Sequence, residues 1–366
     1  MLPAAPEALP IPLDWQALIP YMGRANRALA HYAGMLVGLR NPGVLLSPMT
    51  TQEAVLSSRI EGTQATLGEV LQFDAGRAAD EPQLQLDFFE IVNYRRALRE
   101  AEQELSGRPF TLNLLRRLHA TLLDSVRGTN KGRGEFRKIQ NWIGREGCVL
   151  DEAEFVPPTP ETLMPHLSAW ENYYHADAPD ALVQLALVHG QFEVIHPFLD
   201  GNGRLGRMLI PLFLFEHGLL ARPTFYLSGY LEGHRDEYIG CLRAIGQRAD
   251  GWQRWCEFFL VALAEQAAVN ARTVTRIHEL YENLKPRVVA ATHSQFAVML
   301  LDAIFEHPIF SSTQLTGTAN MPSRPMINIL LNQLIEAQVV SVLRPSSGRR
   351  PQMLMCDELM DICEQR

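Results

Sequence analysis

The apolar residues of the chain recur mostly at three- and four-residue steps, which is the spacing of one face of an α-helix. Near the N-terminus this period runs through Leu18, Met22, Ala25, Leu29 and Ala33. Further helices are predicted over 50–58, 88–105, 181–194, 205–216, 233–245 and 252–284. Gly62 and Pro286 favour helix ends at those positions. The pattern predicts a mainly α-helical protein.

The helical period is interrupted between Gly128 and Pro160, where glycines and prolines are frequent. Within this stretch, 139–143 and 148–150 have the length of short strands, and glycines lie between them. They predict a β-hairpin inserted between long helices. Loops of this kind serve function more often than stability.

The chain changes character again after Pro286. A helix is expected over 294–305, a short helix over 311–317 and a longer helix over 323–337. Two β-rich stretches, 339–343 and 352–355, then surround Ser346-Ser347-Gly348. Helices followed by a hairpin are typical of a winged-helix domain.

Composition narrows the class of protein. The chain has 366 residues, 47% of them hydrophobic, which suggests two or three globular domains. Its net charge of −8 argues against a protein that mainly binds phosphate backbones. Five cysteines without a CxxC pair indicate neither a disulfide framework nor a zinc site. No apolar run reaches membrane-spanning length and no secretory leader is evident, so we expect no membrane contact and a cytoplasmic protein.

The most informative stretch is His196-Pro197-Phe198-Leu199-Asp200-Gly201-Asn202-Gly203-Arg204-Leu205-Gly206-Arg207. It follows one helical pattern and enters another, so Gly201, Asn202 and Gly203 are expected at a helix N-terminus, where backbone N–H groups bind anions. Arg204 and Arg207 share a helix face and can address one polyphosphate. Because no acidic residue lies between these arginines, their proximity predicts an anion.

Two further side chains complete a candidate reaction centre. Asp200 offers a hard oxygen ligand suited to Mg²⁺ beside phosphates. His196 can accept a proton from an attacking hydroxyl near neutral pH. Taken singly, a Gly-Asn-Gly triplet is usually a turn and a lone histidine is usually structural. Together they indicate a base, a metal carboxylate and a phosphate cradle.

This stretch resembles the signature of the Fic-domain family, His-Pro-Phe-x-x-Gly-Asn-Gly-Arg-x-x-Arg, at every fixed position. The resemblance implies a helical Fic fold with a small β-hairpin flap. It divides the chain into an N-terminal helical region over 1–95, a Fic core over 96–285 and a winged-helix domain over 290–366. It also implies an adenylyltransferase that moves AMP from ATP to Ser, Thr or Tyr hydroxyls of proteins, including its own.

The resemblance also assigns roles to residues. His196 is implied as the general base, Asp200 as the Mg²⁺ ligand, Arg204 as the β-phosphate contact and Arg207 as the γ-phosphate contact. Phe198 is expected to anchor the loop in the core. The implied ATP-binding residues are Gly201, Asn202, Gly203, Arg204, Leu205, Gly206, Arg207, Tyr230, Tyr238 and Trp252. The family often has two adjacent tyrosines where this chain has Tyr238-Ile239.

Two regulatory features follow from the same resemblance. The segment 141–158 resembles the flap that docks a protein target by strand-like pairing. The segment 57–62 fits the inhibitory pattern Ser/Thr-x-x-x-Glu-Gly/Asn, with Ser57, Glu61 and Gly62, although 228–233 fits it too. Glu61 is expected to pair bidentately with Arg207 and to occupy the guanidinium that should hold the γ-phosphate. Removal of AMP from targets is left open.

Two alternatives remain at this point. A DNA-binding regulator would use the winged helix, but residues 294–366 carry five basic and seven acidic side chains, which argues against binding to a duplex. A Fic enzyme with another donor would transfer UMP, phosphocholine or phosphate, whereas the unaltered motif favours AMP. The target protein and a homodimer are left open.

Overall fold

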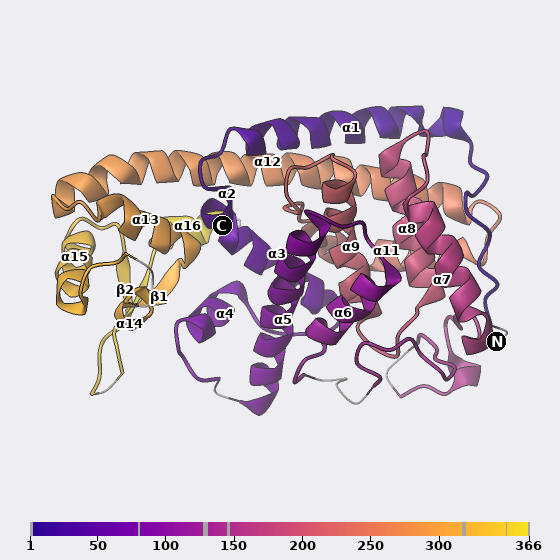
Figure 1. Cartoon of the computed structure of the whole chain (residues 1–366), viewed down its shortest axis with the longest axis horizontal. Helices are drawn as coiled ribbons and strands as arrows, with labels where there is room; N and C mark the ends of the chain where they lie inside the picture. Colours follow the sequence, from indigo (N-terminus) through magenta and orange to yellow (C-terminus); the bar gives the residue numbers. More distant parts are fainter. Residues whose placement is uncertain are drawn as a thin grey trace.

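The computed structural model describes residues 3–79, 81–126, 131–144, 147–316, 320–348 and 350–364. The molecule is elongated, with the N-terminus near one end and a small sheet with its helices at the other (Figure 1). Gly128, residues 145–146 of the predicted flap, Gly317, Arg349 and Arg366 lie outside the described residues.

Two long helices run side by side along the molecule (Figure 1). They are α1 (Trp15–Val37) and α12 (Gly251–Thr292). The helix end expected near Pro286 is wrong, because α12 continues past it to Thr292. Pro286 removes one backbone hydrogen bond, but Leu284 and Val288 on either side of it are fully buried, and this packing holds the last turns in place.

Helix α8 (Ala181–Ile195) is the centre of the core, and every residue after Ala181 is buried. Helices α7 (Pro160–Tyr174), α9 (Asn202–Glu216), α11 (Arg235–Ile245) and α12 pack around it. A helix enclosed on all sides is expected to be apolar all round. The buried polar residues of α8, including His189 and Glu193, are therefore exceptions, and both lie near the site described below.

The N-terminal helices are α2 (Pro42–Leu45), α3 (Ser47–Ile60), α4 (Leu67–Asp74), α5 (Pro82–Leu105) and α6 (Leu112–Leu122). Three of them, α3, α5 and α6, contact α9 of this core. Helix α3 contacts α5, α9 and the short α10 (Ser228–Gly233). It ends as expected at Glu61 and Gly62, and the φ of +101° at Gly62 is a conformation that favours glycine.

The predicted hairpin arms are wrong. Within the described part of 139–150 no strand forms, and Leu150–Glu152 is a single 3₁₀ turn (η1). Instead Ile143 forms an isolated antiparallel bridge with Phe155. Trp142 Nε1 donates to the Cys148 carbonyl, and the amides of Glu154 and Phe155 both donate to Ile143 O, so these groups are not available for the expected ladder.

The C-terminal unit contains the predicted helix, short helix, longer helix and hairpin in that order, together with one further strand and one further helix. Its helices are α13 (Ala297–Glu306), α14 (Ser312–Leu315), α15 (Arg324–Glu336) and α16 (Asp357–Cys363). Its strands β1 (Ile309–Ser311), β2 (Ser341–Arg344) and β3 (Met353–Met355) form an antiparallel sheet in the order β1-β3-β2. The sequence did not predict β1 and α16, which are too short to show a period.

Candidate active site

The loop between α8 and α9 carries the motif of residues 196–207. His196 ends α8 with a φ of 47°, a left-handed conformation that is uncommon for a residue other than glycine. Gly201 precedes the first turn of α9 with a φ of 76°. The helix N-terminus therefore begins at Asn202, as expected for an anion-binding loop.

The loop is fixed from within by Asn202 and Phe198. The Asn202 side chain accepts from Phe198 N at 2.9 Å and donates to Phe198 O at 2.8 Å. The Phe198 ring is fully buried and stacks on His119, with ring centroids 3.8 Å apart. The Asn202 side chain thus shapes the loop, and only its backbone N–H remains for an anion.

Two residues outside the motif hold the loop from either end. His119 Nδ1 accepts from Gly134 N at 2.9 Å, so its Nε2–H donates to the Asp200 carbonyl at 3.0 Å. Arg137 donates from Nε to His196 O at 2.9 Å. Neither residue was predicted from the sequence, because nothing in their local pattern distinguishes them from other polar residues on helices and loops.

A cavity of about 320 Å³ opens at this loop, and it brings together five of the expected site residues. These are Glu61, His196, Gly203, Arg207 and Tyr238. Other lining residues come from the flap, α8 and α11, including Phe155, Glu193, Arg235 and Arg243. The motif, the predicted inhibitory segment and the predicted flap therefore all contribute residues to the lining of one cavity.

The structure does not bring the remaining expected residues to this cavity. Leu205 is fully buried, and Gly206 packs against Glu193 and Phe192. Trp252 lines a neighbouring hollow of about 360 Å³, and Tyr230 stacks on His234.

Arg207 is 2% exposed and is paired with the predicted inhibitory segment. Its Nη2 lies 2.7 Å from Glu61 Oε1 and donates to Ser57 O at 2.7 Å, while its Nε donates to Ser57 Oγ at 3.0 Å. The expected bidentate pairing is wrong, because one guanidinium nitrogen, Nη2, contacts one carboxylate oxygen of Glu61, and Ser57 accepts from Nε and Nη2. Burial opposes ionisation of both groups, but their mutual attraction lowers the pKa of Glu61 and raises the pKa of Arg207.

Arg204 also has an acidic partner, contrary to the expectation from the motif alone. Its Nη1 lies 2.8 Å from Glu90 Oε2, and both side chains are only 4% exposed. Glu90 is on α5, so the partner is distant in sequence and only the tertiary fold reveals it. A second carboxylate, Asp200, is 3.7 Å from Arg204 Nη2 and 3.2 Å from Lys131 Nζ.

His196 is present as a neutral imidazole at physiological pH. Burial lowers its pKa to about 4, and the Glu193 carbonyl and the Glu61 carboxylate only partly offset this effect. Its Nδ1 is buried and has no hydrogen-bond partner among the described residues. A neutral imidazole that lines the cavity can accept a proton.

Glu193 lines the cavity and was not predicted from the sequence. Its side chain is 9% exposed, and Oε1 has no hydrogen-bond partner among the described residues. Burial raises its pKa to about 7, although Arg207 opposes this effect. Its position three residues before His196 on a helix was the available signal, since that spacing places both on one face.

The described residues offer few ligands for a resident metal. Among the described residues, no group of three or more His, Cys, Asp or Glu side chains could hold an ion. Asp200 alone does not make a metal site, but Mg²⁺ is commonly held by one or two carboxylates together with substrate phosphates. The residues therefore fit Mg²⁺ that is shared with a phosphate ligand.

Among the described helices, none has both the length and the apolar character needed to cross a membrane.

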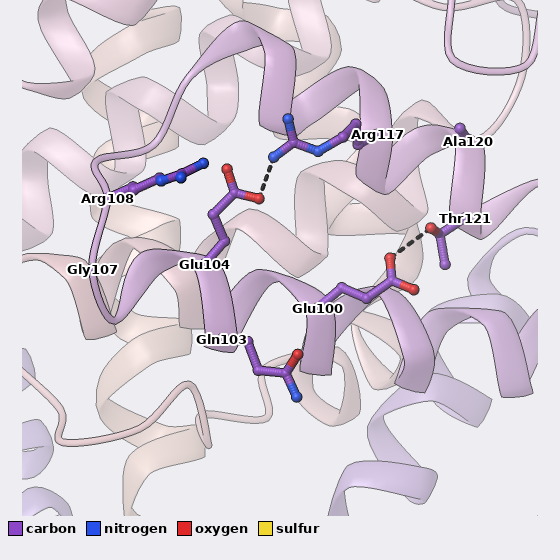
Figure 2. A pocket seen from close by; sticks show the side chains of 8 residues that line it. All are labelled: Glu100, Gln103, Glu104, Gly107, Arg108, Arg117, Ala120 and Thr121. Atoms are coloured by element: carbon purple, nitrogen blue, oxygen red, sulfur yellow. Dashed lines mark hydrogen bonds and ion pairs between the residues drawn. The ribbon is translucent and has the colours of Figure 1, made fainter.

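A larger hollow of about 740 Å³ lies between α5 and α6 (Figure 2). Two of its charged side chains, Glu104 and Arg117, pair with each other, and Glu100 accepts from the Thr121 hydroxyl at 2.7 Å. None of its lining residues is an imidazole, a thiol or part of the motif. Size alone therefore does not identify the reactive site.

Comparisons with known proteins agree with this geometry. The profile described as "Fic/DOC family N-terminal" matches residues 19–103, and the profile described as "Fic/DOC family" matches residues 109–214. A probable protein adenylyltransferase of Aquifex aeolicus is 26% identical over 65% of this chain and 66% of its own length. The protein adenylyltransferase Fic of Drosophila virilis is 30% identical over 43% of this chain. That alignment covers 31% of the length of the Drosophila protein.

Solved structures share the fold. A Fic family protein from Desulfovibrio desulfuricans G20 superposes with a TM-score of 0.58 at 20% identity, covering 97% of this chain and 98% of that one. Residues 134–508 of Fic-1 from C. elegans superpose with a TM-score of 0.56 at 17% identity, covering 74% and 75% of the two chains. These similarities concern the fold.

Proposed function

We propose that this chain, which belongs to the Fic/DOC family, is a protein adenylyltransferase that transfers AMP from ATP to hydroxyl groups of proteins, including its own. The observation that carries the proposal is the cavity that joins a neutral His196 to the start of α9 and to Arg207. The names of the Aquifex and Drosophila relatives support the same activity.

The residues divide the reaction into binding and proton transfer. The backbone at Gly201, Asn202 and Gly203 would receive the phosphates, and Arg207 would bind the γ-phosphate. Arg204 stays assigned to the β-phosphate side, with a smaller contribution because Glu90 already balances its charge. Asp200 would hold Mg²⁺, which supplies positive charge to the phosphates when bound.

His196 would remove the proton from the attacking hydroxyl as that oxygen bonds to the α-phosphorus and pyrophosphate leaves. Its lowered pKa keeps the ring unprotonated and ready for this step at pH 7. Tyr238, Tyr230 and Trp252 remain proposed for the adenine side, with Tyr238 the one that lines the cavity. The flap, 141–158, would dock the target beside His196.

The pair between Glu61 and Arg207 supports autoinhibition by α3. While Glu61 occupies Arg207, the γ-phosphate lacks its counter-ion, and the triphosphate would bind with its α-phosphate out of line. Ser57 and Gly62 belong to the same inhibitory segment. Ser57 accepts hydrogen bonds from the Arg207 guanidinium, and Gly62 follows the end of α3.

We also propose three domains, with limits at 1–95, 96–285 and 290–366. For the C-terminal unit we propose a role in docking a protein or in dimerisation. A role in binding DNA is the weaker candidate because the charge of that unit is unfavourable. A salt-titrated mobility-shift assay with the full chain would separate these roles, because DNA binding predicts a shift that weakens as salt rises.

The test of function is the intact mass of the Glu61→Gly protein after incubation with Mg²⁺ and each nucleoside triphosphate in turn. A gain of one AMP with ATP alone supports the proposal. A gain of UMP or of phosphate would instead assign another donor. No gain with any nucleotide, with or without added candidate proteins, would contradict the proposal.

A further inference from the structure

Three arginines surround a hollow of about 450 Å³ between the end of α4 and the C-terminal unit. The hollow is lined by residues 75–78, Thr313, Arg344, Arg350 and Pro351, and we call it the arginine hollow. The third arginine is Arg77. Among the described residues that line it, none carries a carboxylate, and none also lines the cavity at His196. The arginine hollow is therefore separate from the candidate active site and has a local excess of positive charge.

A bulge in β2 directs Arg344 to this hollow. Val342 pairs with Leu354, and Arg344 pairs with Met353, so β2 contains one extra residue between the two pairs. Paired residues share a face of the sheet, and successive residues of a strand lie on opposite faces. Arg344 therefore lies on the face of Met353, which is buried, and not on the face of Val342, which is exposed. Without the bulge, Arg344 would lie on the same face as Val342.

Arg344 and Arg350 have no acidic partner among the described residues. Arg344 is partly buried, and its Nε is buried without a hydrogen-bond partner in the described part of the chain. Arg350 is held through its backbone, which exchanges two hydrogen bonds with Ser347. Arg77 donates from Nη1 to the neutral side chain of Gln72 at 2.7 Å. The positive charge at this hollow is therefore not neutralised by its own lining.

Guanidinium groups can also bind the carbonyl oxygens at the C-terminal end of a helix. Neither Arg344 nor Arg350 does so at α4, because their side chains donate no hydrogen bond to another described residue. The backbone N–H groups of residues 75–77 all donate to carbonyls of α4, so they are not available to a ligand. The donors that a ligand meets are therefore the guanidiniums and the Thr313 hydroxyl.

The chemistry of these donors selects an anion. A guanidinium presents a planar fork of N–H groups that matches the oxygens of a phosphate group. Charges of the same sign that converge on one hollow repel each other, and an anion between them removes this repulsion. The volume lies within the range of small-molecule sites, about 300–1,000 Å³. Residues 294–366 carry five basic and seven acidic side chains, so the positive charge is confined to the hollow, which suits a compact anion better than a long backbone.

We propose that the arginine hollow binds a small molecule that carries a phosphate or pyrophosphate group. Arg344 and Arg350 bind the phosphate oxygens, and Arg77 adds positive charge from the other side of the hollow. The ligand would contact the end of α4 and the C-terminal unit at the same time. The proposal does not rest on the transfer of AMP.

The test is a calorimetric titration of inorganic pyrophosphate into the full chain at fixed ionic strength. Arg344→Gln and Arg350→Gln should each weaken binding about tenfold, as expected for the loss of a hydrogen bond to a charged group. Arg350 is exposed, so its variant keeps the test valid if Arg344→Gln is unstable. Arg324→Gln is the matched control, because Arg324 is an exposed arginine of the same unit that does not line the hollow. Its affinity should equal that of the parent.

Three results would overturn the proposal. The parent might bind no pyrophosphate, or both hollow variants might bind it as tightly as the parent, which would place the ligand elsewhere. The third is an equal loss in Arg324→Gln, which would indicate attraction by the charge of the whole unit. The same titration with a short DNA duplex is the remaining arm: a duplex that binds more tightly than pyrophosphate would assign these arginines to nucleic acid instead. None of these measurements involves AMP transfer, so a failure here is distinguishable from a failure of the proposed function.

Discussion

Glu61 Oε1 lies 2.7 Å from Arg207 Nη2, although 146 residues separate the two in sequence. The two partners differ in exposure: the Glu61 side chain is 41% exposed and the Arg207 side chain is 2% exposed. The acid can therefore leave for solvent, while the arginine stays in place on α9. This asymmetry is what a removable inhibitor requires, because withdrawal of Glu61 presents a buried cation to the cavity.

The first prediction concerns this pair. Glu61→Gly should increase labelling of the purified protein by ATP and Mg²⁺ by at least about tenfold, since a charge-assisted contact worth about 1.4 kcal/mol would no longer compete with the γ-phosphate. Intact mass spectrometry over time measures the rate.

Glu232→Gly is the matched control, because Ser228 to Gly233 fits the same sequence pattern. That glutamate does not line the cavity, so the control should label like the parent. Equal rates for Glu61→Gly and the parent would reject autoinhibition by Glu61.

The second prediction concerns the proton acceptor. In the Glu61→Gly background, His196→Ala should reduce labelling by about 10² to 10⁴, the usual contribution of a general base. ATP affinity should remain close to that of the parent, because the imidazole is assigned to the attacking hydroxyl and not to the phosphates. His31→Ala, at an exposed position on α1, should change neither quantity. Labelling that survives in His196→Ala would remove His196 from this role.

The sequence predicted the parts of the site that are contiguous and missed those that depend on packing. The loop 196–207 and the end of α3 at Gly62 carry local signals, so their structures followed from spacing and glycine geometry. Glu90, His119 and Arg137 contact the loop from other elements, and their own neighbours in sequence give no sign of it. The longer helices with a clear period were predicted for the same reason, whereas α2, α4 and α6 were not. The flap ladder failed because Ile143 pairs with Phe155 instead and the Trp142 side chain occupies the Cys148 carbonyl.

The third prediction concerns the pH dependence of stability. Burial lowers the pKa of His119 and His196 to about 4 and of His189 to about 3. Between about pH 5 and 6 these three rings bind protons mainly in the unfolded chain, so stability is lost as the pH falls. Burial raises the pKa of Glu53 and Glu193 to about 7, which has the opposite effect in the same range. For these five groups together the balance is about one proton in favour of the unfolded chain.

Glu193→Gln tests this balance, because it removes one of the two opposing carboxyl groups. The slope of unfolding free energy against pH, from urea titrations between about pH 5 and 6, should rise from about one proton to about two. Glu135→Gln removes an exposed carboxyl group paired with Lys138 and should leave the slope unchanged. An unchanged slope in Glu193→Gln would mean that Glu193 is ionised throughout this range.

The fourth prediction concerns the buried pair of Glu90 and Arg204, both 4% exposed. Glu90→Gln should destabilise the protein by about 3–5 kcal/mol, because it leaves the Arg204 guanidinium buried without its main counter-ion. Glu135→Gln removes an exposed ion pair and should cost no more than about 1 kcal/mol. Urea unfolding at pH 7 compares the two variants. Similar small costs would mean that Asp200, 3.7 Å from the other side of the guanidinium, balances Arg204 without Glu90.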